Sequence, residues 1–321
     1  MENLFENLAM GFSILQNPVV LLYALSGVLA GVIIGALPGL GPSVGIAVLL
    51  PLTYGMDAAA GIILLSGIYY GAMYGGSITS ILINTPGDSA AIMTALDGYP
   101  LTQKGQAGKA LGMAAYASVI GGTISVVAFM LLAPVISSYA LAFGSSEYFA
   151  LMILGLTSIA GMTGDSPSKG FLAVFTGLFI SLIGLDLVTG AQRYVFGNVN
   201  LYSGIDFIPV AMGLFGIAEI ISVNSGGEIN IDKESIKIKN LFPNKQEWKD
   251  CGPHIGRGTA LGFFIGMLPG AGATIASFLS YSMAKKTSKK GDKFGTGLLE
   301  GVAAPESANN AASMGAMVPM L

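Results

Sequence analysis

Residues 35–45 read GALPGLGPSVG, with four glycines and two prolines in the middle of an apolar run. No charged side chain occurs between Val19 and Leu50, so the run has the composition of a membrane-embedded helix. Proline breaks a helix because it lacks an N–H and its ring clashes with the preceding turn. A lipid-exposed backbone cannot leave N–H and C=O groups unpaired. We therefore expect this break to be buried in protein or to line a cavity.

The whole composition fits a membrane protein. The 321 residues are 53% hydrophobic and 10% charged, and the mean hydropathy is +0.70; soluble domains carry about 25% charged residues. Recurring apolar segments predict an all-α polytopic membrane protein in a lipid bilayer. These segments lie at 17–56, 58–83, 108–143, 146–163, 170–188, 205–223 and 258–284.

Two kinds of site find little support in the composition. The net charge of −3, without a basic face, gives no indication of nucleic-acid binding. The single cysteine, Cys251, and the single histidine, His254, share a polar stretch, where ordinary loop residues are favoured over a metal site. We therefore predict no bound metal cofactor.

The basic residues indicate a topology. Both flanks of 258–284 are rich in lysine, which favours the cytoplasmic side for both ends. A segment with both ends on one side cannot cross once, and a break at Pro269–Gly270 leaves two halves of about a dozen residues. That pattern predicts a re-entrant helical hairpin. The earlier break has the acidic flanks Glu2, Glu6 and Asp57, so its hairpin is expected to open to the outside.

An internal repeat connects the two breaks. GVLAGVIIGALPGLG (27–41) aligns with GTALGFFIGMLPGAG (258–272), with eight of fifteen positions identical. Five predicted spans lie between the breaks, and an odd number inverts the second copy. Inverted repeats with matching broken helices are typical of secondary transporters and point to the binding site. The predicted organisation is a first repeat at 1–223, a cytoplasmic linker at 224–257 and the start of a second repeat at 258–321.

Each copy contains a glycine stripe followed by a tip. Glycines at every fourth position are best explained by close helix packing. At the tip, glycine permits left-handed turns, a hydroxyl is placed to cap the next half-helix, and free N–H groups there suit an anion. A simple helix kink is the alternative. The predicted substrate-binding residues of the two tips are Pro38, Gly39, Gly41 and Ser43, and Pro269, Gly270, Gly272 and Thr274.

A third break, ILINTPGDSA (81–90), concentrates polar groups where an apolar segment stops. We predict that it also lines the substrate site, with an ordinary turn at the membrane surface as the alternative. The predicted binding residues here are Asn84, Thr85, Pro86, Gly87 and Asp88, and the loop extends to Ser89.

Two further patterns bear on chemistry. GPSVG (41–45) matches the G-x-S-x-G nucleophile motif, but that motif needs a strand-to-helix turn and a histidine partner. We therefore predict a ligand or capping hydroxyl at Ser43 and no catalytic residue. Intramembrane acids are functional candidates. In LLEGVAAPESANNAA (298–312), the candidates for coordinating a coupling cation are Glu300, Glu306, Asn309 and Asn310.

The chain resembles the large membrane subunit of the tripartite tricarboxylate transporters, the TctA family. The resemblance is carried by GALPGLGPSVGIAVLLPLTYGM, YYGAMYGGSITSILINTPGD, LPGAGATIASFLSYSMAKK and FGTGLLEGVAAPESANNAASMGAMVPML. It implies a multi-pass carrier of the bacterial inner membrane for citrate-like carboxylates, coupled to sodium or protons. It also implies a small membrane subunit and a periplasmic solute-binding protein as partners. Family members continue beyond MVPML, so we expect a truncated chain that lacks the counterpart of the NTPGD loop.

The combined prediction is an inverted-repeat secondary transporter that binds a di- or tricarboxylate between the two tips and the loop at 84–89. The apolar spans contain almost no lysine or arginine away from their ends, so a co-bound cation is expected to offset the substrate's charge. The alternatives are a stand-alone secondary anion carrier, a membrane-embedded serine hydrolase using Ser43, and a passive channel.

Overall fold

The structure is a computed structural model that describes residues 4–38, 40–140, 144–160, 167–186, 188–206, 209–210, 212–217, 221, 240–267 and 272–316. Helices dominate the described chain. The α-helices are α1 (Leu4–Leu15), α2 (Pro18–Gly35), α3 (Pro42–Leu49), α4 (Ala58–Ile83), α5 (Ile92–Gln103), α6 (Ala107–Ala140), α7 (Ser145–Ala160), α8 (Pro167–Ser181), α11 (Lys245–Gly266), α12 (Gly272–Thr287) and α13 (Leu299–Gly315).

The remaining elements are short. They are the 3-10 helices η1 (Leu50–Thr53), η2 (Ser89–Ala91), η3 (Val199–Leu201) and η6 (Gly291–Lys293), the π-helix η4 (Met212–Ile217), and the strands β1 (Gly184–Leu185) and β2 (Gln192–Arg193). The two strands pair antiparallel, with Gly184 opposite Arg193.

Several helices have the length and composition of membrane spans. Among the described residues, α2, α4 and the first part of α6 (Ala107–Leu132) are long and apolar enough to cross a membrane. This agrees with the predicted all-α membrane fold, and α4 coincides with the predicted segment 58–83. A helix that the sequence analysis did not anticipate is α5, which is shorter and less apolar than a span. Most of the predicted segment 205–223 lies outside the described residues.

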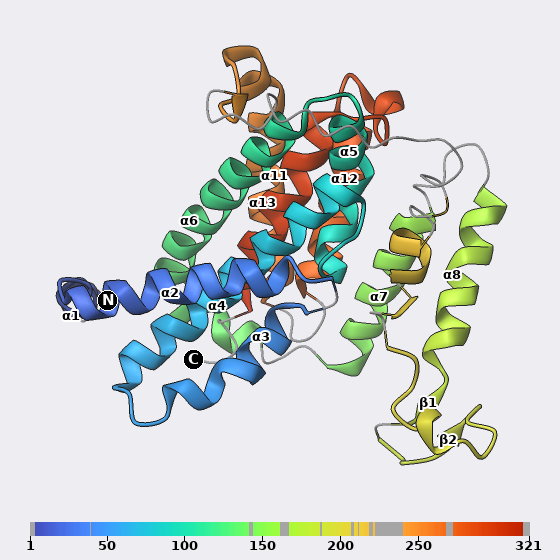
Figure 1. Ribbon diagram of the computed structural model, residues 1–321, viewed down its shortest axis with the longest axis horizontal. Coiled ribbons are helices and arrows are strands. Elements are labelled where there is room, and N and C mark those ends of the chain that lie inside the picture. The colour runs from blue at the N-terminus through green and yellow to red at the C-terminus, as the bar shows by residue number, and fades with distance from the viewer. Residues whose placement is uncertain are drawn as a thin grey trace.

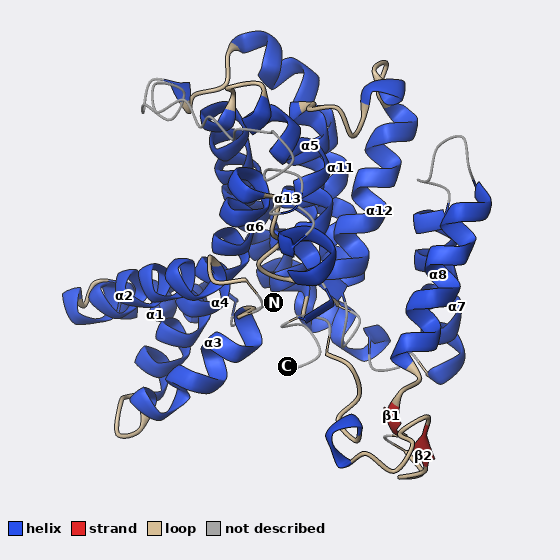
Figure 2. Cartoon of the chain, turned by 45° about the vertical axis from the view of Figure 1, so that its right-hand side comes forward, coloured by secondary structure: helices blue, strands red, loops and turns tan. Residues whose placement is uncertain are grey.

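The central helix of the fold is α13. It contacts α5, α6, α11 and α12, and nearly all its residues are buried (Figure 1). The α2–α4 pair lies to one side of this bundle, with α3 packed against α4. Helices α7 and α8 stand side by side on the opposite side, with the β1–β2 hairpin below them (Figures 1 and 2).

The first break is a true interruption between two helices. Helix α2 ends at Gly35, three residues before Pro38, and α3 begins at Pro42. Two details of the prediction are wrong. Gly41 has φ −62° and ψ 177°, an extended rather than left-handed conformation, and it is itself the N-cap of α3. Ser43 therefore lies inside the first turn and does not cap the helix. Gly39 lies outside the described residues.

The second break occurs at the equivalent position. Helix α11 ends at Gly266, the repeat partner of Gly35, and α12 begins at Gly272. The predicted tip residues Pro269 and Gly270 lie outside the described residues. At its other end, α11 begins earlier than the predicted repeat boundary, because Asn244 and Glu247 form a capping box. Residues 245–257 of the predicted linker are therefore helical.

The glycine stripe of the first repeat allows two backbones to touch. A Cβ added at Gly31 would lie 2.3 Å from the Ile68 carbonyl oxygen, and one at Gly35 would lie 2.1 Å from that of Ala72. The contact is reciprocal, because a Cβ at Gly71 of α4 would lie 2.2 Å from the Val28 carbonyl oxygen. The packing explanation of the stripe is therefore confirmed for this helix pair.

The second repeat uses the same packing. A Cβ at Gly262 would lie 2.2 Å from the Ala308 carbonyl oxygen, and one at Gly266 would lie 2.3 Å from that of Ala312. The α11–α13 pair thus repeats the α2–α4 pair, with the last glycine of each stripe also ending its helix.

We expect Gly35→Ala and Gly266→Ala each to lower the free energy of unfolding by about 1–3 kcal/mol, because a methyl group would separate the packed backbones. Thermal unfolding of the purified protein measures this. Gly177→Ala is the matched control: it lies within α8, and a Cβ there would meet nothing within 4 Å. Equal midpoints for all three variants would contradict the packing role.

Candidate functional site

Three predicted segments meet at one cavity of about 320 Å³. Its lining includes the first turn of α3 (Gly41–Val44), the loop after α4 (Gly87–Ala90) and the first turn of α12 (Ala273–Thr274). We call this space the tip cavity. Two residues from α4, Tyr69 and Met73, complete one wall, and Asp206 adds a carboxyl group. The sequence analysis did not single out these last three residues.

Two helix N-termini face the tip cavity. Ser43 is the second residue of α3 and is exposed, and its hydroxyl makes no hydrogen bond with the described residues. Thr274 is the third residue of α12 and lines the same cavity. The first N–H groups of a helix lack intrahelical acceptors and carry partial positive charge. This part of the cavity is therefore suited to an anion.

The first three residues of the NTPGD loop (84–86) form the turn that follows α4, and they do not line the tip cavity. Asn84 ends α4 in the left-handed conformation, with φ 53°, and its N–H bonds to the Thr79 carbonyl oxygen. The Thr85 hydroxyl donates to the Ile83 carbonyl oxygen at 3.1 Å. Pro86 is buried. These three predicted binding residues are therefore not part of the cavity lining.

The second part of the loop reaches the cavity. A Cβ at Gly87 would lie 2.3 Å from the Gly35 carbonyl oxygen and 2.4 Å from the Gly76 Cα, so only glycine fits between the end of α2 and α4. The Asp88 carboxylate accepts a hydrogen bond from the Ala91 N–H at 2.9 Å and caps η2. The backbone contact at Gly87 thus positions Asp88 and Ser89 at the cavity.

A direct bond joins the loop to the second break. The hydroxyl oxygens of Ser89 and Thr274 are 2.6 Å apart, and either can donate. The Ser277 hydroxyl, one turn along α12, donates to the Ala90 carbonyl oxygen at 2.7 Å. The loop of the first repeat is therefore fastened to α12 at two points.

The tip cavity has an unusual charge pattern for an anion site. Among its described lining residues, the charged groups are Asp88 and Asp206, and none is Lys, Arg or His. Hydroxyl and N–H donors are the groups available to a bound carboxylate. Nor does Ser43 have a histidine partner there, because His254 lies beside Glu300, with 3.8 Å between Nε2 and Oε2. The G-x-S-x-G hydrolase arrangement is therefore not formed in the described chain.

The four cation candidates fall into two groups. Glu306 is fully buried, and its carboxylate accepts hydrogen bonds from Ser77 at 2.6 Å, from Ser118 at 3.2 Å and from Thr94. Asn309 and Asn310 lie in the same network, where the Asn310 amide donates to the Ser118 hydroxyl at 2.8 Å. The sequence analysis missed the three hydroxyl residues.

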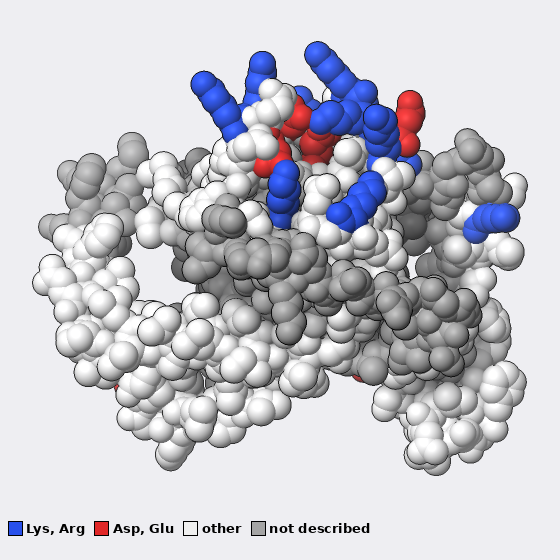
Figure 3. Space-filling view, turned by 45° about the horizontal axis from the view of Figure 1, so that its top comes forward, with Lys and Arg blue, Asp and Glu red and all other residues white. Residues whose placement is uncertain are grey.

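Glu300 belongs to a different cluster. Its carboxylate lies 3.3 Å from Lys290 Nζ and accepts a hydrogen bond from Ser288. Lys290 also pairs with Asp250 at 2.5 Å. Their hydrogen bond lowers the pKa of Asp250 and raises that of Lys290. Glu300 is thus part of an ion-paired cluster with Lys290 and Asp250, and lysines gather at the top of the molecule in Figure 3.

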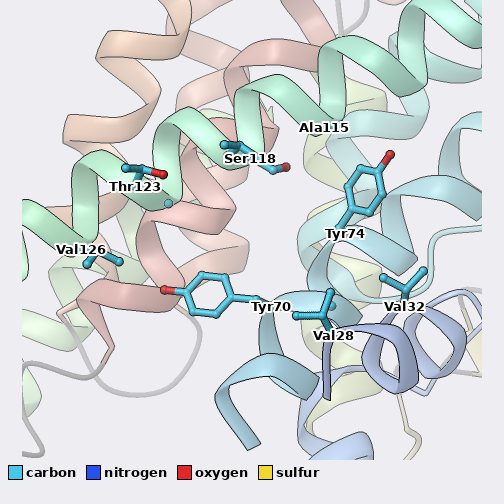
Figure 4. Close-up of a pocket in the computed structure, with 11 residues that line it drawn as sticks. Val28, Val32, Tyr70, Tyr74, Ala115, Ser118, Thr123 and Val126 are labelled. Atoms are coloured by element: carbon cyan, nitrogen blue, oxygen red, sulfur yellow. The ribbon is translucent and has the colours of Figure 1, made fainter. Parts of the chain in front are cut away.

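A second cavity of about 460 Å³ lies between α2, α4 and α6 (Figure 4). Val28 and Val32 of α2 face it from one side, and Ser118 and Thr123 of α6 face it from the other. Tyr70 and Tyr74 project into it from α4. We call it the lateral cavity. It is mainly apolar, but the Ser118 hydroxyl connects it to the Glu306 network.

Comparison with known proteins gives the following similarities. Residues 21–321 match the family described as "Tripartite tricarboxylate transporter TctA family". The chain is 43% identical over 321 residues to an "Uncharacterized 52.8 kDa protein in TAR-I ttuC' 3'region" of Agrobacterium vitis, covering all of this chain and 64% of that relative. An "Uncharacterized protein in TAR-II ttuC' 3'region" of the same organism is 53% identical over 60 residues, 19% of this chain and 25% of that relative. No solved structure matches.

The Ser89–Thr274 contact is testable by cross-linking. In a variant in which Ala replaces Cys251, we expect Ser89→Cys and Thr274→Cys together to form a disulfide under mild oxidation, because the two native hydroxyls touch. Mass spectrometry of the proteolysed protein detects the linked peptides. The pair Thr53→Cys and Thr274→Cys is the control, since Thr53 ends η1 beyond α3. Absence of the first cross-link, or equal yields from both pairs, would contradict the geometry.

Proposed function

Because the chain belongs to the tripartite tricarboxylate transporter TctA family, we propose that it carries the substrate pathway of a cation-coupled uptake system for di- or tricarboxylates. The family is one of membrane transporters, which argues against an enzyme. In this proposal the protein works in the bacterial inner membrane with a small membrane subunit and a periplasmic solute-binding protein. The chain covers 64% of the length of the relative that is 43% identical to it. These roles are therefore proposed for the assembled transporter and not for this chain alone.

The observation that carries the proposal is the convergence of two helix N-termini and the NTPGD loop on the tip cavity. A carboxylate is a planar anion with acceptor oxygens, and the cavity offers donors to it. Hydroxyl donors come from Ser43, Ser89 and Thr274, and N–H donors come from the starts of α3 and α12. Substrate carboxylates held at half-helix N-termini are a recurring arrangement in secondary transporters.

The charge pattern gives a reason for cation coupling. A tricarboxylate adds up to three negative charges to a cavity that already holds Asp88 and Asp206. Without a basic side chain in the described lining, the repulsion is large in a low-dielectric site. Co-transported cations would offset it. Binding of the substrate is then expected to depend on sodium or on protons.

The distribution of lysines supports an orientation. Most Lys and Arg side chains seen in Figure 3 gather at one end of the molecule, around the ends of α5, α11 and α12, whereas the exposed Arg193 lies on β2. By the positive-inside rule this end is proposed to face the cytoplasm. The equivalent packing of α2 on α4 and of α11 on α13 supports the proposed inverted repeat.

The test is carboxylate binding by the assembled transporter, measured by calorimetry for a panel of di- and tricarboxylates with and without sodium. We expect Thr274→Val to weaken binding about tenfold, because it removes a hydroxyl at constant shape, and Thr274→Ser to retain most of the affinity. Thr157→Val, on α7 outside the tip cavity, is the control.

If Thr274→Val bound carboxylates with normal affinity, the substrate site would lie outside the tip cavity. Uptake that needs no solute-binding protein would favour the stand-alone carrier. Labelling of Ser43 by a serine-reactive probe would favour the hydrolase.

A further inference from the structure

Glu306 is a buried carboxylate without a counter-ion among the described residues. It is 0% exposed, and its side-chain contacts are with Ser77, Thr94, Ser118 and Asn309. An isolated buried charge costs several kcal/mol even when hydroxyl groups solvate it. The network is therefore one positive charge short of neutrality when the carboxyl group is ionised.

We infer that this network is the binding site of the coupling cation, a proton on the Glu306 carboxyl or a sodium ion held between its oxygens and those around it. The inference rests on the proposed carboxylate transport. Five oxygen atoms converge there, two from Glu306 and one each from Ser77, Thr94 and Ser118, while the Asn309 amide donates to Glu306 through Nδ2 at 3.5 Å. Each hydroxyl can rotate from donating a hydrogen bond to offering a lone pair. Hard cations prefer oxygen ligands of this kind.

The site is separate from the tip cavity but shares two elements with it. Along α4, Tyr69 and Met73 line the tip cavity, and Ser77 follows one turn later on the same helix face. Along η2 and α5, Ser89 lines the cavity, and Thr94 bonds to Glu306. A cation that binds the Ser77 and Thr94 hydroxyls therefore acts on α4 and on the η2–α5 segment, the two elements that also line the tip cavity.

The lateral cavity borders the same network. Ser118 lines that cavity and also donates to Glu306 (Figure 4).

The ionisable groups near Glu306 are few. Asp88 and Tyr74 act on it electrostatically from the α4 side. On α5, Asp97 is occupied by the N–H groups of Gly297 and Leu298, each at 2.8 Å, and by the Tyr281 hydroxyl. Among the described residues of α6 and α11, no Lys, Arg or His contacts Glu306. Glu300 is excluded as the cation site because Lys290 already neutralises it.

The experiment compares the assembled transporter with Glu306→Gln, Ser118→Ala and Glu300→Gln in the absence of carboxylate. Binding of radioactive sodium is measured directly, and the thermal midpoint is measured against pH in choline chloride. If sodium is the cation, the wild type binds it saturably, Glu306→Gln does not, and Ser118→Ala binds it about tenfold more weakly. If the proton is the cation, the wild-type midpoint rises through one step as the pH falls, and Glu306→Gln lacks that step.

We expect Glu300→Gln to match the wild type in sodium binding if sodium is the cation, and in the pH dependence of the thermal midpoint if the proton is the cation. Ser118→Ala keeps the inference testable if Glu306→Gln fails to fold: it must weaken sodium binding or shift the pH step. Sodium binding and pH dependence unchanged in both network variants, or absent from the wild type, would overturn the inference. Because neither assay contains carboxylate, a failure of carboxylate binding would count against the proposed function and not against this site.

Discussion

The structure depends on backbone-to-backbone contact at the end of α2. Gly35 leaves no room for a side chain against Ala72, and its carbonyl oxygen meets the backbone of Gly87. One glycine therefore packs α2 on α4 and supports the loop that lines the tip cavity. In a membrane, where lipid is as apolar as the side chains, such close packing is a principal source of helix association. The same contact that holds the helices together thus also positions the loop at the site.

In the second repeat, Gly266 likewise ends α11 in backbone contact with Ala312 of α13. Helix α13 takes part both in this packing and in the buried polar network. One face of α13 presents the carbonyl groups of Ala308 and Ala312 to the α11 glycines. Another face carries Glu306 and Asn310 into a network with α4, α5 and α6. Movement of α11 or α12 would thus act directly on the helix that carries the buried carboxylate. In the proposed transporter, this arrangement is a physical route by which the coupling cation and the substrate would influence each other.

The sequence allowed the helix breaks and their convergence to be predicted, because proline and glycine are local signals and the 15-residue repeat, at an offset of 231 residues, pairs the two breaks. The capping role of Ser43 was mispredicted, since a helix start shifted by two residues is invisible in the pattern. Ser77, Thr94 and Ser118 were missed for a different reason. Single hydroxyls in apolar helices resemble ordinary packing residues, and their partner Glu306 lies 229 residues from Ser77 in the chain. Asn309 and Asn310 could be found because they adjoin Glu306 in sequence.

The central claim is that the two helix starts and the NTPGD loop together hold the carboxylate. The most direct measurement is an electron cryomicroscopy map of the assembled transporter with a tricarboxylate bound in sodium-containing buffer. The account predicts ligand density between residues 41–44, 87–90 and 273–274, with carboxylate oxygens within hydrogen-bond distance of the first N–H groups of α3 and α12. Ligand density in the lateral cavity or at the lysine-rich end, with the tip cavity empty, would contradict it.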